Sequence, residues 1–300
     1  TRKASSPEPT MAQAHQHHKS LNQFIIFSST TSALNMKFHP GCQDLQQHID
    51  HYWIVDQVDK VFTAAQPLYA YPGITPELIL VLEGHYRCRY QGRWENVYES
   101  RLYSFLEQDI ILDLSPLSSF IIVQFKSRAL SSILPFLNCR AEQVMANPIC
   151  SVEDAWGDQI IRICDQLKVS ASSERVAILD EWLSRNQHSQ HGSFLLEMVS
   201  EMGEDYTPAQ ILDRTGYSRS TLERHFKKDA GLTPKRYQSL QRYKAAVQEI
   251  YLTRNTDWQH YVHTYGYFDQ SHFIKEVKRY TSFTPSQLIH TPGLLSFRPR

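Results

Sequence analysis

The sequence predicts an α+β protein made of a β-rich domain followed by an all-α domain. Two observations support this. In the first half, short apolar or alternating runs recur about every ten residues between turn signals, as in barrels and two-sheet sandwiches. In the second half, apolar residues follow helical spacing, and helix-start signals precede several of the runs. A length of 300 residues suits about two domains.

In the first domain, turn signals such as Pro72-Gly73 and Gln91-Gly92 separate the predicted strands. These strands lie at residues 51–56, 77–82, 86–90, 110–114 and 120–125. We expect them to form a cupin-like barrel or sandwich. Helical spacing at residues 129–137, 156–167 and 173–183 predicts a helical extension of this domain.

The second domain has strong helix-start signals. Thr207, Thr233 and Thr284 each precede a proline, which predicts an N-cap hydroxyl before a proline in the first turn. Thr256 and Gln259 have the spacing of a capping box. The predicted helices are residues 194–202, 208–214, 218–228, 234–252, 257–264, 269–280 and 285–290.

Polar segments divide the chain further. Residues 1–35 are polar and His-rich, which predicts a flexible extension, and Met36 opens a more regular pattern. The β-rich domain with its C-terminal helices is expected at residues 36–183, a linker at 184–193 and the helical domain at 194–290. Residues 291–300 are expected to be a tail.

Composition excludes several classes of protein. With 41% hydrophobic and 21% charged residues, the chain is not a disordered one. No window approaches the roughly 18 apolar residues of a membrane helix, and the polar N-terminal segment is not a signal peptide. The five cysteines are scattered and form no C-x-x-C pair, which favours reduced thiols in a cytoplasmic protein. We therefore expect no membrane, cofactor or metal.

The formal net charge of zero hides an asymmetry. Residues 206–290 hold 13 Lys and Arg against 7 Asp and Glu, whereas residues 1–205 hold 16 against 24. A basic module beside an acidic one indicates that the helical domain faces a polyanion such as nucleic acid.

An internal repeat gives this basic domain a function. Gly216-Tyr217, Leu222, Phe226 and Thr233-Pro234 recur 50 to 51 residues later. The second copy comprises Gly266-Tyr267, Phe273, Val277 and Thr284-Pro285. Each copy reads as a short helix, a turn with glycine and a basic helix, which is the helix-turn-helix plan for entering a major groove. The joining helix, roughly 28 Å long, would set the two copies about one DNA turn apart.

The sequence resembles the AraC/XylS family of transcription regulators. The resemblance covers residues 194–290 and rests on Arg242, Ala245, Thr284-Pro285 and two motifs. These are G-Y-S-x-x-x-L-x-R-x-F-K-K-x-x-G-x-T-P-x-x-Y at residues 216–237 and G-Y-x-D-Q-S-H-F-x-K at residues 266–275. In the N-terminal half, residues 51–53, 72–73, 77–79, 120–125 and 156–157 are similar to sensory regions found ahead of such modules.

Three positions depart from the family pattern. Leu212 and Val262 stand where the first helix of each motif usually has a small residue. Ser282 replaces the glycine that corresponds to Gly231. Bulkier residues imply wider packing or altered angles between helices, so the second motif is expected to be the weaker reader.

In each of the two basic helices, the apolar residues share one side, so the other side is polar. By resemblance, Ser220, Glu223 and Arg224 face bases, and Arg224 suits guanine while Glu223 suits cytosine. Gln270 suits adenine, and Lys275 suits guanine or phosphate. The full set of expected DNA-binding residues is Arg219, Ser220, Glu223, Arg224, Lys227, Lys228, Gln270, Ser271, His272, Lys275, Lys278 and Arg279. Among these, Lys227, Lys228, Lys278 and Arg279 are expected to hold phosphates.

By resemblance, the β-rich domain senses an effector or mediates self-association. Its candidate effector-binding residues are His51, Trp53, Tyr71 and Glu77, although for any one of them a structural role is the alternative. Cys88, between Arg87 and Arg89, is a candidate for a lowered thiol pKa and redox sensing. No catalytic residues are expected, because no G-x-S-x-G, P-loop or dinucleotide fingerprint is present. A cupin metal site is not expected either, because His85 has no second histidine two residues on.

These observations predict a sequence-specific DNA-binding transcription regulator that reads two successive major grooves. Its expected partners are double-stranded DNA, a small-molecule effector, a second copy of the chain and RNA polymerase. Two alternatives stay open: a small-molecule enzyme with a helical accessory element, and a protein-interaction regulator whose DNA binding has degenerated.

Overall fold

The computed structural model describes residues 35–56, 68–70, 75–104, 106, 110–126, 133–137, 141–187, 195, 198–199 and 207–290. The predicted tail, nearly all of the predicted N-terminal extension, and residues 188–193 of the predicted linker lie outside these residues. So does most of the helix predicted at 194–202.

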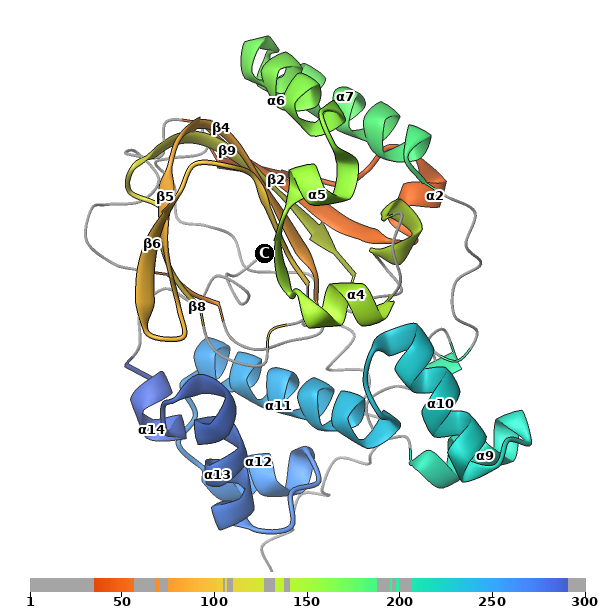
Figure 1. Ribbon diagram of the computed structural model, residues 1–300. Helices are drawn as coiled ribbons and strands as arrows, with labels where there is room; N and C mark the ends of the chain where they lie inside the picture. The colour runs from red at the N-terminus through yellow and green to blue at the C-terminus, as the bar shows by residue number, and fades with distance from the viewer. Residues whose placement is uncertain are drawn as a thin grey trace, which may run out of the picture. The chain divides into compact units, whose positions relative to one another are not determined.

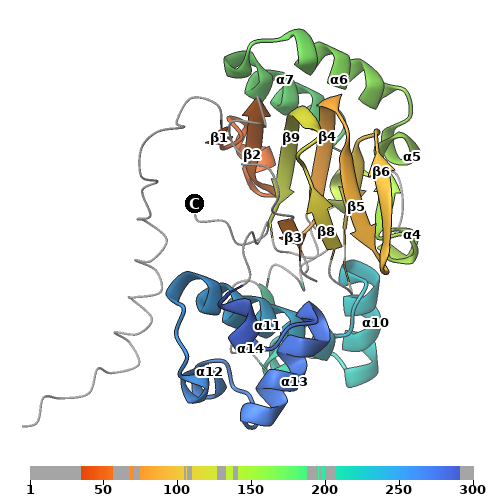
Figure 2. The same cartoon turned by 90° about the vertical axis from the view of Figure 1, so that its left-hand side faces the viewer.

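The N-terminal part holds two antiparallel sheets that face each other (Figures 1 and 2). The first sheet has the order β1 (Asn35–Phe38), β2 (Ile49–Asp56), β9 (Leu117–Phe125), β4 (Glu77–Gly84), β7 (Arg101–Tyr103) and β10 (Ile149–Ser151). The second has the order β3 (Leu68–Ala70), β8 (Ile110–Asp113), β5 (Tyr86–Tyr90) and β6 (Arg93–Val97). The prediction of a β-rich sandwich is confirmed; a single closed barrel is not formed by the described strands.

The central strands of the larger sheet are buried on both faces. Along β4, Leu78 and Leu80 belong to the core beneath the helices, whereas Ile79 belongs to the core between the sheets. On β2, Tyr52 likewise belongs to the core beneath the helices and Trp53 to the core between the sheets. Successive side chains of a strand point to opposite faces, so a strand covered on both sides needs a continuous apolar run.

Short helices follow the strands and cover the outer face of the larger sheet (Figure 1). They are α4 (Ala141–Ala146), α5 (Val152–Trp156), α6 (Gln159–Val169) and α7 (Ser172–Arg185), with α2 (Gln43–Gln46) and a 3-10 turn at Leu134–Phe136. The helix predicted from residue 156 begins three residues later, because Gly157 adopts φ 59° and ends α5. Of the helix predicted at 129–137, the described residues form only the 3-10 turn.

The C-terminal part is all helical. Its helices are α9 (Pro208–Thr215), α10 (Arg219–Ala230), α11 (Pro234–Thr253), α12 (Trp258–Thr264), α13 (Gln270–Thr281) and α14 (Pro285–Leu288). Thr207, Thr233 and Thr284 cap α9, α11 and α14 as predicted. The capping box predicted at Thr256 is wrong: Asp257 is the N-cap of α12, and its carboxylate accepts from two backbone N–H groups. Among the described residues, no helix is both long and apolar enough to cross a membrane.

The structure accommodates the three residues that depart from the family pattern, Leu212, Val262 and Ser282. Leu212 packs half-buried against the helical core, and Val262 is buried within it. Ser282 ends α13 in the left-handed region at φ 62°, where Gly231 ends α10 at φ 72°. A residue with a Cβ atom adopts this conformation at a cost of roughly 1 kcal/mol, so the second motif keeps the turn geometry of the first in spite of its serine.

Candidate nucleic-acid interface

Helix α10 presents a polar face because its apolar residues share the other. Gly216 turns the chain at φ 66°, and the Ser218 hydroxyl then caps the helix by accepting from the Thr221 N–H at 3.2 Å. Leu222 and Phe226 are buried, one helical turn apart. The six residues predicted to bind DNA from this helix are all exposed: Arg219, Ser220, Glu223, Arg224, Lys227 and Lys228.

Helix α13 repeats this arrangement. Asp269 caps it by accepting from the His272 N–H at 2.6 Å, and Phe273 and Val277 are buried. The predicted DNA-binding residues divide by exposure: Gln270 and His272 are half-buried, and Ser271, Lys275, Lys278 and Arg279 are exposed. The polar face of α13 is therefore continuous from its first turn to its last.

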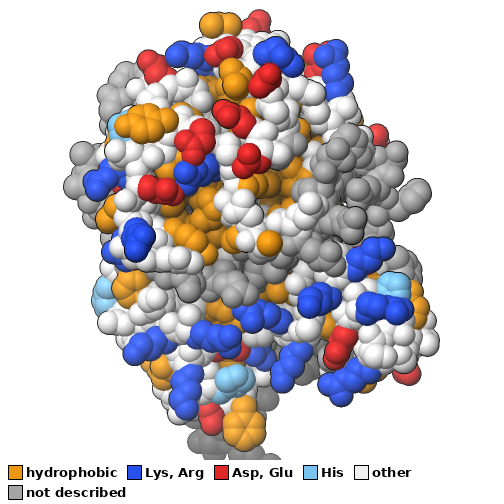
Figure 3. Space-filling view, viewed as in Figure 1, with side chains coloured by type: hydrophobic (Ala, Val, Ile, Leu, Met, Phe, Trp, Pro, Cys, Tyr) orange, Lys and Arg blue, Asp and Glu red, His pale blue; other side chains and the backbone are white. Residues whose placement is uncertain are grey.

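Positive charge accompanies both helices. Figure 3 shows Lys and Arg side chains spread over the surface of the helical part that faces the viewer. Lys227 and Lys228 lie in the last turn of α10, and Lys278 and Arg279 lie in the last turn of α13. Cations at a helix C-terminus are stabilised by its dipole, and in this arrangement they also offer the protein contacts to phosphate.

A largely buried ion pair joins α13 to α11, and sequence reasoning missed it. Arg242 Nη2 donates to both carboxylate oxygens of Glu276 at 3.0 Å, and the Ser239 hydroxyl donates to one of them at 3.0 Å. The Glu276 and Arg242 side chains are only 11% and 23% exposed. The Arg242 guanidinium also lies 4.4 Å from the centre of the Tyr267 ring. These contacts fix the orientation of α13.

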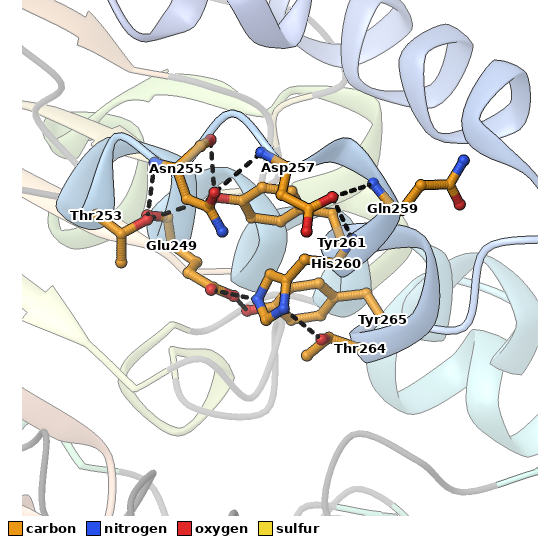
Figure 4. Close-up of polar contacts among 9 residues, drawn as sticks. All are labelled: Glu249, Thr253, Asn255, Asp257, Gln259, His260, Tyr261, Thr264 and Tyr265. Carbon is orange, nitrogen blue, oxygen red and sulfur yellow. Dashed lines mark hydrogen bonds and ion pairs between the residues drawn. The ribbon is translucent and has the colours of Figure 1, made fainter. Parts of the chain in front are cut away.

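A second polar network ties α12 to the end of α11 (Figure 4). The Glu249 carboxylate on α11 accepts from the Tyr265 hydroxyl at 2.6 Å and lies 2.7 Å from His260 Nε2. The Thr253 side chain and the Tyr261 hydroxyl meet at 3.4 Å. Both helices of the second motif are therefore fastened to α11.

The first motif rests on the other half of α11. Phe226 of α10 packs edge-on against Tyr237 of α11, with 5.3 Å between ring centres. Further along α11, Tyr243 meets Tyr280 of α13 at 4.6 Å. One continuous helix of 20 residues thus carries both basic helices.

In the β-rich part, three of the four candidate effector residues share one face of a sheet. His51 on β2 pairs with Gln124 on β9, which pairs with Glu77 on β4. Trp53 lies two residues beyond His51 and so points to the same side, toward the core between the sheets. Tyr71 lies outside the described residues. Residues directly opposite in adjacent strands lie side by side, which makes His51, Gln124 and Glu77 a polar row in which His51 and Glu77 are buried and Gln124 is half-buried.

This polar row has an unusual ionisation. Gln124 Nε2 donates to the Glu77 carboxylate at 3.0 Å, while His51 Nδ1 lies 2.9 Å from an oxygen of Asp50. Burial raises the pKa of Glu77 to about 6, although the positive charge of Lys244 and the hydrogen bond from Gln124 both act in the opposite direction. Near pH 6, a carboxyl group with this pKa is charged in some molecules and neutral in others, so a ligand can bind either form.

Two other features of the β-rich part lie apart from this row. The lowered thiol pKa expected at Cys88 is wrong: the side chain is fully buried, and burial raises its pKa to about 11. A surface pocket of about 350 Å³ lies elsewhere, and no predicted effector residue lines it. Its lining residues are Tyr90, Glu95, Glu99, Arg101, Asn147, Pro148, Ile149, Cys150, Ser151 and Asp154.

Comparison with protein families decides the nature of the helical part. Residues 211–290 match the model of a helix-turn-helix domain family, and they include α9 from its fourth residue and all of α10, α12 and α13. This is an AraC-type helix-turn-helix domain. The prediction of a DNA-binding transcription regulator is thereby confirmed, with double-stranded DNA as its partner.

Among solved structures, the chain is similar to ToxT from Vibrio cholerae. An apo variant of ToxT is 12% identical, with coverage of 80% of this chain and 97% of that one and a TM-score of 0.44. A ToxT structure with a bound unsaturated fatty acid is 11% identical, with coverage of 78% and 94% and a TM-score of 0.41. No curated protein matches the sequence.

Proposed function

We propose that this regulator reads two successive major grooves of one DNA duplex, with α10 in one groove and α13 in the next. The observation that carries the proposal is the attachment of both basic helices to the single helix α11. At 1.5 Å per residue, its 20 residues span about 30 Å, close to the ~34 Å of one DNA turn. A rigid element of that length suits two half-sites on one face of the duplex.

We assign base contacts to the polar side chains near the start of each helix and phosphate contacts to the cations in its last turn. Arg224 is the group for a bidentate contact with guanine, and Gln270 is the group for adenine. Glu223 lies near Arg219, with 3.6 Å between charged atoms, and would accept from a cytosine amine once DNA is bound. Contacts from Lys227, Lys228, Lys278 and Arg279 would set register without sequence information.

Selection of bound sequences from a random DNA pool by the full chain tests the proposal. We expect two short motifs about one helical turn apart. Arg224→Ala should blur one motif and weaken its recognition by about 1–3 kcal/mol, and Gln270→Ala should do the same to the other. Arg162→Ala, an exposed change on α6, is the matched control and should leave both motifs intact. Weak binding without sequence enrichment would contradict sequence reading and favour the degenerate alternative.

We further propose that a small-molecule effector acts through the polar row of His51, Gln124 and Glu77. Support comes from its chemistry, since polar side chains that converge in an apolar core can fix the orientation of a ligand. A candidate effector should raise the melting temperature of the wild-type chain and leave that of Gln124→Leu unchanged. Equal shifts in both proteins would place the effector elsewhere.

Three further expectations follow from DNA as the partner. A regulator of this kind acts in the cytoplasm, where it meets DNA and RNA polymerase. Self-association through the β-rich part is the alternative route of control, and the two half-sites read by one chain do not require it. Sedimentation of the full chain measures whether a dimer forms. The helical domain provides no evidence for an enzyme.

A further inference from the structure

One large apolar side chain next to the proposed DNA-reading face is exposed to solvent. Phe268 is 90% exposed, whereas the buried phenylalanines of the helical part, Phe226 and Phe273, are fully enclosed. Single exposed apolar residues are common, and exposure alone identifies no partner. Its position is more specific, because Phe268 directly precedes Asp269, the N-cap of α13.

Anchored neighbours hold Phe268 in this position. Tyr267 is buried between the Arg242 guanidinium and the Phe273 ring, whose centre lies 5.1 Å away. On the other side, the Asp269 carboxylate accepts from the His272 backbone N–H at 2.6 Å. The backbone N–H of Phe268 itself donates to His272 Nδ1 at 3.4 Å. Because both neighbours are fixed, the backbone at Phe268 is already ordered when a partner arrives, which lowers the entropic cost of binding.

The first motif has no counterpart of Phe268. In that motif, Gly216 is followed by Tyr217 and then by the cap residue Ser218. In the second motif, one residue more separates Gly266 from its cap, and that additional position is Phe268. The two motifs therefore present different chemistry at the ends of their basic helices.

We propose that Phe268 reads a thymine in the second half-site by contacting its C5-methyl group. This inference rests on the proposed function. The N-terminal residues of a recognition helix meet the base edges, and thymine offers the apolar group among the base edges of the major groove. Phe268 lies beside Gln270 and Ser271, which supply hydrogen bonds but no apolar contact. The aromatic ring would give the second motif a preference for A·T pairs next to the base that Gln270 reads.

Removal of single methyl groups from the DNA tests this assignment. Deoxyuridine replaces thymidine, one position at a time, in the second half-site of the selected sequence, and the affinity of the full chain is measured. The wild-type protein should lose about fourfold in affinity at one position, the equivalent of one apolar carbon. Phe268→Ala should bind the thymine site about four- to tenfold more weakly and show no further loss with uracil.

Two controls isolate the contact. Leu252→Ala removes another exposed apolar side chain, 44% exposed at the end of α11, and should preserve the sensitivity to uracil. Uracil in the first half-site should weaken wild type and Phe268→Ala equally. The melting temperature of Phe268→Ala should equal that of wild type, because the lost ring touches solvent.

The possible results distinguish failure of the Phe268 assignment from failure of the proposed function. If the wild-type chain selects two motifs but ignores uracil throughout the second one, the assignment of Phe268 is overturned and the proposed function stands. If Phe268→Ala keeps full DNA affinity but loses transcriptional activity, the ring contacts a protein, and the assignment is again overturned. If the wild-type chain selects no sequence, the proposed function itself fails.

Discussion

Replacement of Arg242 by alanine should lower the free energy of unfolding of the helical part by about 2–4 kcal/mol. The change removes the guanidinium that donates to both carboxylate oxygens of Glu276, which is 11% exposed and keeps the hydrogen bond from Ser239, and a buried charge that loses its counter-charge is costly. It also uncovers the Tyr267 ring. Urea unfolding of the full chain, followed by far-UV circular dichroism, measures the loss.

Arg219→Ala is the matched control for this prediction. It breaks the ion pair with Glu223, whose charged atoms lie 3.6 Å apart, and Arg219 is 85% exposed. Exposed pairs contribute roughly 0–1 kcal/mol, so the loss should be small. In the double variant Arg242→Ala and Glu276→Ala, part of the stability should return, because no buried charge remains. A loss from Arg242→Ala no larger than that from Arg219→Ala would contradict the structural role of the pair.

The helical part was largely predictable because its signals are local. Caps at Thr207, Thr233 and Thr284 come from a hydroxyl and a proline in adjacent positions, and the observed helices begin and end within about two residues of the predicted ones. The error at Thr256 has a local cause as well. Asp257, the next residue, offers a carboxylate that accepts from two N–H groups and therefore starts the helix one position later.

The β-rich part was predictable where strands are apolar or alternate between apolar and polar residues. β6 was missed because four of its five residues are exposed, so its sequence Arg-Trp-Glu-Asn-Val shows no buried face. Three-residue strands such as β7 and β10 are too short for a periodic pattern. Their places in the sheets are set by pairing with distant strands, which local sequence does not reveal.

The exposed face of α10 was predictable from the sequence, because Leu222 and Phe226 define the buried side and so leave the other side exposed. Contacts between residues that lie far apart in the sequence were not predictable. Arg242 and Glu276 lie 34 positions apart, and no spacing rule connects them. Cys88 shows the converse error: two neighbouring arginines suggested a lowered pKa, but alternation along β5 turns the thiol inward and the arginines away from it.

The central claim is that α11 holds two DNA-reading helices at one fixed separation, and the spacing between half-sites tests it most directly. We would insert about five base pairs, half a helical turn, between the two selected motifs and measure the affinity of the full chain. The second helix would then face the opposite side of the duplex. Loss of two base contacts at about 1–3 kcal/mol each should weaken binding by roughly 30-fold or more, to the affinity of a single half-site. Unchanged affinity would contradict the claim, because it would mean that the two motifs do not read DNA together.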